Sequence, residues 1–299
     1  MSAHADSRRA VLLALGANAA IFVAKLTAAL LTRSGSMLAE AVHSLADCGN
    51  QGLLLLGLRQ ARRPPSPDHP LGWGKALYFW SFLVAILLFS VGGMFSLAEG
   101  LHKLADPQPL RWPWLAVGVL AFGVVAESFS MAGALAAINT TRGTRSLWRW
   151  FRDSRQSELI VVFGEDLAAL LGLVLALLAV LATLLTGDPG WDALGSMAVG
   201  ALLVVVALFI AVEVMALLIG QSVEPELRDA LRDFIAARPE VRRVFSLITL
   251  QLGPDVMLAV KAEMAPAVDL IAAINAVERD LKARFPVVRW SFFEPDVAD

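Results

Sequence analysis

Long apolar runs alternate with short polar segments over most of the chain. A helix that crosses a bilayer needs about 20 predominantly apolar residues. Runs of that length lie at about 10–31, 37–58, 77–101, 113–138, 157–186 and 191–220. The pattern therefore predicts an all-α membrane domain of six transmembrane helices within residues 1–220, in contact with membrane lipid.

The pattern changes after Gly220. Residues 224–237 have helical periodicity, and residues 241–252 and 256–264 read as two strands joined by a Gly-Pro-Asp turn. A second helix at 268–285 and a last strand at 287–294 complete the order helix-strand-strand-helix-strand (α-β-β-α-β). Residues 221–299 are therefore predicted to form a small α+β, ferredoxin-like domain with helices on one face of a short sheet. Because so small a domain buries a limited core, we expect it to pair with a second copy.

Composition supports a membrane protein and excludes several functions. The chain has 299 residues, of which 57% are hydrophobic and 17% charged, against about 25% charged in soluble domains. The net charge of −2 gives no reason to expect a nucleic-acid partner, and the single cysteine, Cys48, excludes an intrachain disulfide. No phosphate-binding loop, nucleophile elbow or H-E-x-x-H motif is present, so neither an enzyme nor an ATP-driven pump is expected.

Basic residues predict the orientation of the helices. Lys and Arg gather in the N-terminal segment and in the connections near 59–75 and 142–155, whereas the opposite connections contain only Arg33, Lys103 and Arg111. The positive-inside rule then places both termini in the cytoplasm. Since the N-terminus does not resemble a mitochondrial presequence, a bacterial plasma (inner) membrane is the expected location.

The second apolar run contains a polar face. At about 100° per residue, Glu40, His43, Asp47 and Asn50 fall within an arc of roughly 80° on a helix. A charged side chain at bilayer depth costs about 2.5–3.5 kcal/mol on insertion scales. His43 and Asp47 are four residues apart, and imidazole and carboxylate at that spacing can bind one divalent cation. Asn50 is either a neutral ligand or a hydrogen-bonding group between helices.

Further acids occur in the fourth and fifth runs. Glu165 and Asp166 are adjacent, so their side chains diverge by about 100° and only one is expected to join His43 and Asp47. Glu127 is a candidate supporting or proton-carrying group, with a packing role as the alternative.

Two weaker features complete the candidates. Asp68 and His69 lie in the turn-rich loop 66–75 and form a weak candidate for a second metal site. Glu99 and Asp192 lie near predicted helix ends, where solvation at the membrane interface explains them.

These motifs resemble the cation diffusion facilitator family of zinc-type transporters. Residues 43–51 (HSLADCGNQ), 67–75 (PDHPLGWGK) and 165–172 (EDLAALLG) look like the branch that contains the mitochondrial zinc transporter and its bacterial relatives. The resemblance implies a homodimer, without a prosthetic group, that exports a divalent cation in exchange for protons. Zinc is the expected cation. It implies that the ion binds between the second and fifth helices through His43, Asp47 and Asp166, with Glu165 nearby.

The chain departs from the family pattern at three places. Val162 stands where a histidine or acid is usual, so Glu165, Asn50, Glu127 or water must complete the ligand set. Trp73 stands where the loop site has a second histidine, and no His or Cys follows residue 102. Lys75 matches a lysine of the family's inter-subunit charge lock, but no partner acid is found near 219–220.

Two alternatives therefore stay open. With fewer nitrogen ligands, manganese, iron or cobalt becomes an alternative cargo. A non-transporting membrane scaffold is the alternative of another class. Glu40, at the end of the arc, is expected to belong to the exit path.

Overall fold

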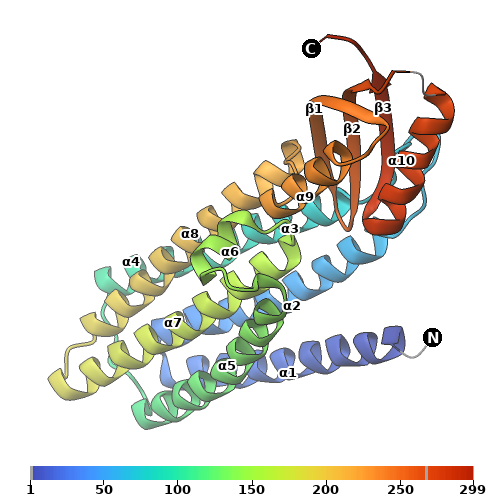
Figure 1. The fold of residues 1–299 in the computed structure, drawn as a ribbon. Helices are drawn as coiled ribbons and strands as arrows, with labels where there is room; N and C mark the ends of the chain where they lie inside the picture. The colour runs from blue at the N-terminus through green and yellow to red at the C-terminus, as the bar shows by residue number, and fades with distance from the viewer. Residues whose placement is uncertain (1–2, 267–268, 299) are drawn as a thin grey trace. The chain divides into compact units, whose positions relative to one another are not determined.

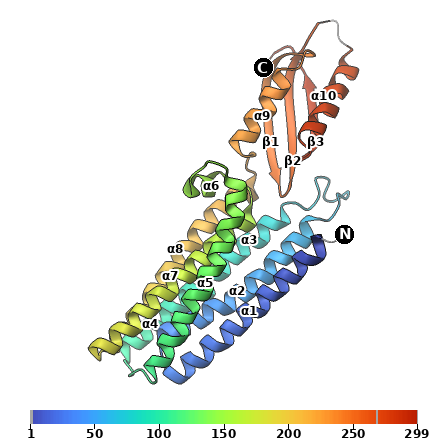
Figure 2. The ribbon, with the colours of Figure 1, turned by 60° about the horizontal axis from the view of Figure 1, so that its bottom comes forward.

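The computed structural model describes residues 3–266 and 269–298, with side chains from residue 18 onward except at 141. Long helices account for most of the chain before residue 220, and they run roughly parallel to one another (Figures 1 and 2). These elements are α1 (Ala3–Thr32), α2 (Gly35–Ala61), α3 (Ala76–Leu87), the π-helix η1 (Leu88–Met94), α4 (Phe95–Ala105), α5 (Pro113–Arg142), the short α6 (Leu147–Asp153), α7 (Ser157–Thr186) and α8 (Gly190–Ile219).

Among the described residues, four helices are long and apolar enough to cross a membrane. They are Ala76–Ala105, which joins α3, η1 and α4, together with Pro113–Thr140, Ser157–Thr186 and Gly190–Ile219. At 1.5 Å per residue, each exceeds the roughly 30 Å of a hydrocarbon core. The four corresponding predicted runs are thus confirmed as apolar helices of spanning length. Within α1 the described apolar part, Asn18–Thr32, is shorter, and α2 contains the polar face, so two of the six predicted spans stay predictions.

Small residues let the long helices approach closely. A Cβ atom added at Gly195 of α8 would lie 2.2 Å from the Cβ of Ala179 in α7. A Cβ at Gly172 of α7 would lie 2.5 Å from Glu40 Oε1 of α2. The two glycines therefore allow α7 to lie directly against α8 and α2, as small residues do in helix pairs within lipid.

The C-terminal elements match their predicted order. They are α9 (Pro225–Ala236), β1 (Val241–Leu252), β2 (Asp255–Met264), α10 (Leu270–Arg284) and β3 (Val288–Pro295). The sheet order is β1-β2-β3, with β1 antiparallel and β3 parallel to β2. Alternate β2 residues such as Val256, Leu258 and Val260 form one core with Leu231 and Ile235 of α9 and Val277 and Leu281 of α10. Both helices therefore cover the same face of the sheet. Residue 268, the expected start of the second helix, lies outside the described residues.

Contacts divide the chain into two compact units. One contains the chain up to Leu56 with Trp80–Arg145 and Glu158–Val212, and the other contains Gly57–Phe79, Ser146–Ser157 and Glu213–Asp299. The second unit joins the sheet domain to the start of α3. There Gly253 N–H donates to the Tyr78 hydroxyl at 2.9 Å, and a Cβ at Gly74 would lie 2.0 Å from the carbonyl oxygen of Leu252.

Candidate metal site on helix α2

The predicted polar face of α2 lies inside the helix bundle. Glu40, His43 and Asn50 are fully buried, and the Asp47 side chain is 14% exposed. His43 Nε2 and Asp47 Oδ2 are 3.7 Å apart, one helical turn from each other. The arc deduced from the sequence is therefore one surface that faces protein and not lipid.

Much of this face has no hydrogen-bond partner in the described part of the chain. Both ring nitrogens of His43, Asp47 Oδ1, Asn50 Oδ1 and Gln51 Oε1 are buried and unpaired. A buried polar atom left unpaired costs about 1–3 kcal/mol, and several on one helix face are exceptional. Lone pairs of nitrogen and oxygen gathered in this way suit a divalent cation.

Helix α7 contributes its two adjacent acids in different directions, as expected. Glu165 is buried and its Oε1 accepts a hydrogen bond from Asn50 Nδ2 at 2.5 Å. Asp166 instead accepts from the Ser130 hydroxyl of α5, with Oγ 3.2 Å from both carboxylate oxygens. Asn50 thus forms the bond between helices that the sequence left as one of two alternatives.

The acids of α5 and α7 act electrostatically on the α2 face. Asp166 and Glu165 each interact with Asp47, and Glu127 interacts with both Asp47 and Asp166. Among the described residues, however, no three His, Cys, Asp or Glu side chains lie close enough to hold a metal ion. The direct ligand set therefore stays a prediction. Val162, one turn before Asp166, has no ligating atom.

Lys25 of α1 is the member of this cluster that the sequence reasoning missed. Its side chain is 1% exposed, and its ammonium nitrogen lies 3.1 Å from Glu40 Oε2 and 2.9 Å from Ser44 Oγ. A lone lysine in the apolar run 10–31 was the available signal, because a charge at bilayer depth is functional by default. Glu40 is thus half of a buried ion pair, a role the sequence did not indicate.

The loop of residues 66–75 does not gather ligands. His69 stacks on Trp73 with ring centroids 3.8 Å apart, and Asp68 is exposed. Lys75 donates to the carbonyl oxygen of Leu218 at 3.3 Å, where the helix dipole of α8 favours a cation. The indole of Trp73 therefore covers the imidazole at the position where the family pattern has a second ligand.

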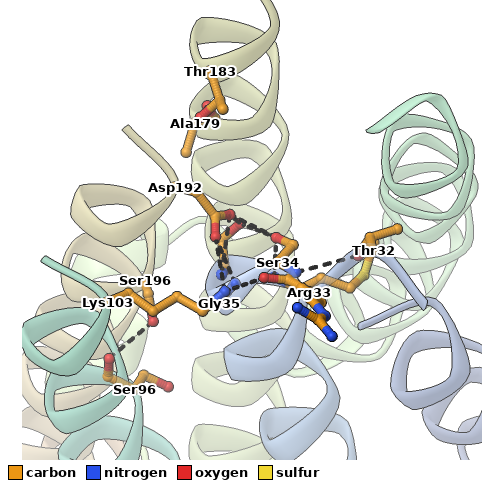
Figure 3. Close-up of polar contacts among 12 residues, drawn as sticks. Thr32, Arg33, Ser34, Gly35, Ser96, Lys103, Ala179, Thr183, Asp192 and Ser196 are labelled. Atoms are coloured by element: carbon orange, nitrogen blue, oxygen red, sulfur yellow. Dashed lines mark hydrogen bonds and ion pairs between the residues drawn. The ribbon is translucent and has the colours of Figure 1, made fainter. Parts of the chain in front are cut away.

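The interpretation of Asp192 as an acid solvated at a helix end is wrong. Asp192 is 1% exposed and accepts hydrogen bonds from the Ser34 hydroxyl at 2.6 Å, the Gly35 amide at 2.6 Å and the Ser36 hydroxyl at 2.6 Å. Figure 3 shows its carboxylate pointing at this turn, with Lys103 of α4 alongside. The Lys103 Nζ atom lies 3.6 Å from Asp192 Oδ2. The carboxylate caps the N-terminus of α2, where free amides and the helix dipole favour an anion.

The long apolar helices and the buried polar face define a multi-pass membrane protein. Comparison with known families then identifies its class, because the model of the cation efflux transmembrane domain matches residues 11–219. The chain belongs to the cation efflux, or cation diffusion facilitator, family, whose members are transporters and not enzymes. The resemblance inferred from the sequence motifs is confirmed.

Named relatives include eukaryotic and bacterial transporters. The chain is 35% identical over 247 residues to the proton-coupled zinc antiporter SLC30A9, mitochondrial, of Xenopus laevis, covering 82% of this chain and 44% of that protein. It is 30% identical over 252 residues to metal tolerance protein C4 of Arabidopsis thaliana, covering 83% and 55%. It is 28% identical over 284 residues to the cation-efflux pump FieF of Klebsiella pneumoniae, covering 93% and 89%. The chain thus spans about half the length of the two eukaryotic relatives.

Proposed function

We propose that this chain exports a divalent metal cation, zinc in the first instance, across a membrane in exchange for protons. The observation that carries the proposal is the set of buried, unpaired lone pairs on His43, Asp47 and Asn50. The names of the zinc antiporter and the efflux pump among its relatives support the same function. No resident prosthetic group is needed, because the metal is cargo.

His43, Asp47 and Asp166 are the proposed ligands. His43 and Asp47 already lie one turn apart, and Asp166 is the α7 acid on the side of Ser130. Glu165 and Asn50 brace α2 against α7 in this proposal and are reserve ligands for the position lost at Val162. A histidine nitrogen with carboxylate oxygens suits Zn²⁺, whereas an oxygen-richer set favours Mn²⁺.

Competition for the same lone pairs couples the two fluxes. Imidazole and carboxylates must lose their protons before they bind metal, so binding releases protons and protonation releases metal. Histidine commonly changes charge near neutral pH. With alternating access, uptake on the alkaline side and release on the acidic side follow from this competition alone.

The proposed assembly is a homodimer with six spanning helices in residues 1–220 and a cytoplasmic domain in residues 221–299. The size of the sheet domain supports pairing with a second copy, and the basic connections support cytoplasmic termini. The bacterial efflux pump among the relatives supports a bacterial inner membrane. The buried polar face explains why α2 is less apolar than the other spans.

Metal-resolved transport in proteoliposomes tests the function. With a pH gradient, the wild-type chain should move Zn²⁺ and protons in opposite directions. His43→Ala and Asp47→Ala should abolish both fluxes, whereas His102→Ala, at an exposed histidine of α4, should leave them intact. Full transport by both site variants would refute the site, and absence of any flux or saturable binding in the wild type would favour a membrane scaffold.

A further inference from the structure

The ion pair between Lys25 and Glu40 is unusual in an apolar bundle. Both side chains are at most 1% exposed, and the Ser44 hydroxyl accepts a second hydrogen bond from Lys25. The desolvation of two charges commonly equals or exceeds their attraction, so a buried pair is weak support for stability. The pair therefore calls for a reason other than stability.

Its position supplies that reason. Glu40 precedes His43 by three residues on the same buried face of α2. Lys25 holds Glu40 Oε2, while Oε1 has no hydrogen-bond partner in the described residues and lies against Gly172 of α7. One carboxylate oxygen of Glu40 thus remains available one turn from His43, and the ammonium group of Lys25 restrains this carboxylate.

We propose that Lys25 is a specificity-determining positioning residue that keeps Glu40 out of the metal ligand set. This inference rests on the proposed function. With Lys25 present, the cation meets one imidazole and the carboxylates of Asp47 and Asp166. Without it, Glu40 adds a further hard oxygen donor one turn from His43.

The surrounding charges make the restraint necessary. The Lys25 charge acts on His43 and Asp47 of α2 and on Glu127 of α5, and Glu165 and Asp166 of α7 also interact with Asp47. Among the described residues, Lys25 is the cation that acts on this acidic group. Its removal frees Glu40 to bind another positive charge nearby. In the transporting protein that charge is the metal.

The expected consequence is a change of metal preference. Oxygen donors shift a site from zinc toward Mn²⁺, and changes in groups that orient ligands alter metal affinity about 10–100-fold. Lys25→Met should therefore raise the affinity for Mn²⁺ relative to Zn²⁺ by about tenfold or more. The double variant Lys25→Met/Glu40→Gln removes the freed carboxylate and should restore the wild-type ratio of Mn²⁺ to Zn²⁺ affinity. Lys25→Arg keeps the positive charge and should retain that ratio.

Isothermal titration of the full chain in detergent with Zn²⁺ and with Mn²⁺ tests this inference. A ratio that moves in Lys25→Met and returns in the double variant supports it; an unmoved ratio, or a double variant that stays shifted, overturns it. If Lys25→Met does not fold, the Zn²⁺ affinity of the Lys25→Met/Glu40→Gln variant is compared with that of the wild type instead. An affinity within threefold of wild type supports the inference, and a larger loss overturns it. Wild-type protein that binds neither ion refutes the proposed function together with this inference, whereas normal wild-type binding with an unmoved ratio refutes only the inference.

Discussion

Asn50 of α2 donates a hydrogen bond to Glu165 of α7 at 2.5 Å, and both residues are buried. This bond fixes the two helices that the proposed cation would bridge. Asn50→Ala leaves the Glu165 carboxylate without its donor, which costs about 1–3 kcal/mol. We expect a lower midpoint of thermal unfolding in detergent, with most of the loss recovered in Asn50→Ala/Glu165→Ala. An unchanged midpoint in the single variant would contradict the contact.

Gly172 tests how tightly α7 approaches α2. A Cβ at this position would lie 2.5 Å from Glu40 Oε1, so Gly172→Ala must displace the carboxylate or the helix. Overpacking of this kind costs about 1–3 kcal/mol and should lower the thermal midpoint. Gly118→Ala in α5 is the matched control, because nothing lies within 4 Å of its added Cβ. Equal effects of the two substitutions would argue against the close approach.

Asp192 should stabilise the protein through the turn before α2. Asp192→Ala removes the acceptor for Ser34, Gly35 and Ser36 together. Loss of a buried partner for several donors predicts a destabilisation of at least about 1–3 kcal/mol, measured by thermal unfolding. Asp106→Ala, at an exposed carboxylate that follows α4, should change the midpoint little. A wild-type midpoint for Asp192→Ala would restore its interpretation as a solvated acid.

The stack of His69 on Trp73 predicts a gain of function by substitution. Because the ring centroids are 3.8 Å apart, Trp73→His brings a second imidazole to His69 and Asp68. Titration calorimetry should then show one more Zn²⁺ site per chain than in the wild type, whereas Trp73→Phe should add none. The same stoichiometry in Trp73→His and Trp73→Phe would show that the loop cannot gather ligands.

Local pattern predicted most of the fold. β1 has the predicted bounds, and α9, β2, α10 and β3 differ from prediction by at most two residues at either end, because alternation and helical periodicity are properties of neighbouring residues. The polar face of α2 was likewise predicted from the sequence, since residues 40–50 lie on one helix.

Contacts between helices could not be predicted from the sequence in the same way. Lys25 pairs with Glu40 across 15 positions and Asp192 bonds to Ser34 across 158, so neither partner is visible in the local sequence. The apolar surroundings in the sequence indicate that burying each charge costs free energy, but they do not identify the group that stabilises it. Glu165 and Asp166 show both cases. Helix geometry predicts that their side chains diverge, whereas their hydrogen-bond partners, Asn50 and Ser130, depend on how the helices pack.

X-ray absorption at the zinc edge of the metal-loaded full chain tests the central claim most directly. Binding by His43, Asp47 and Asp166 predicts nitrogen and oxygen neighbours at about 2.0–2.2 Å and no sulfur at about 2.3 Å, with the outer-shell scattering of an imidazole. That scattering should disappear in His43→Ala and persist in His102→Ala. A zinc–sulfur distance from Cys48, or a spectrum that His43→Ala leaves unchanged, would contradict the proposed site on α2.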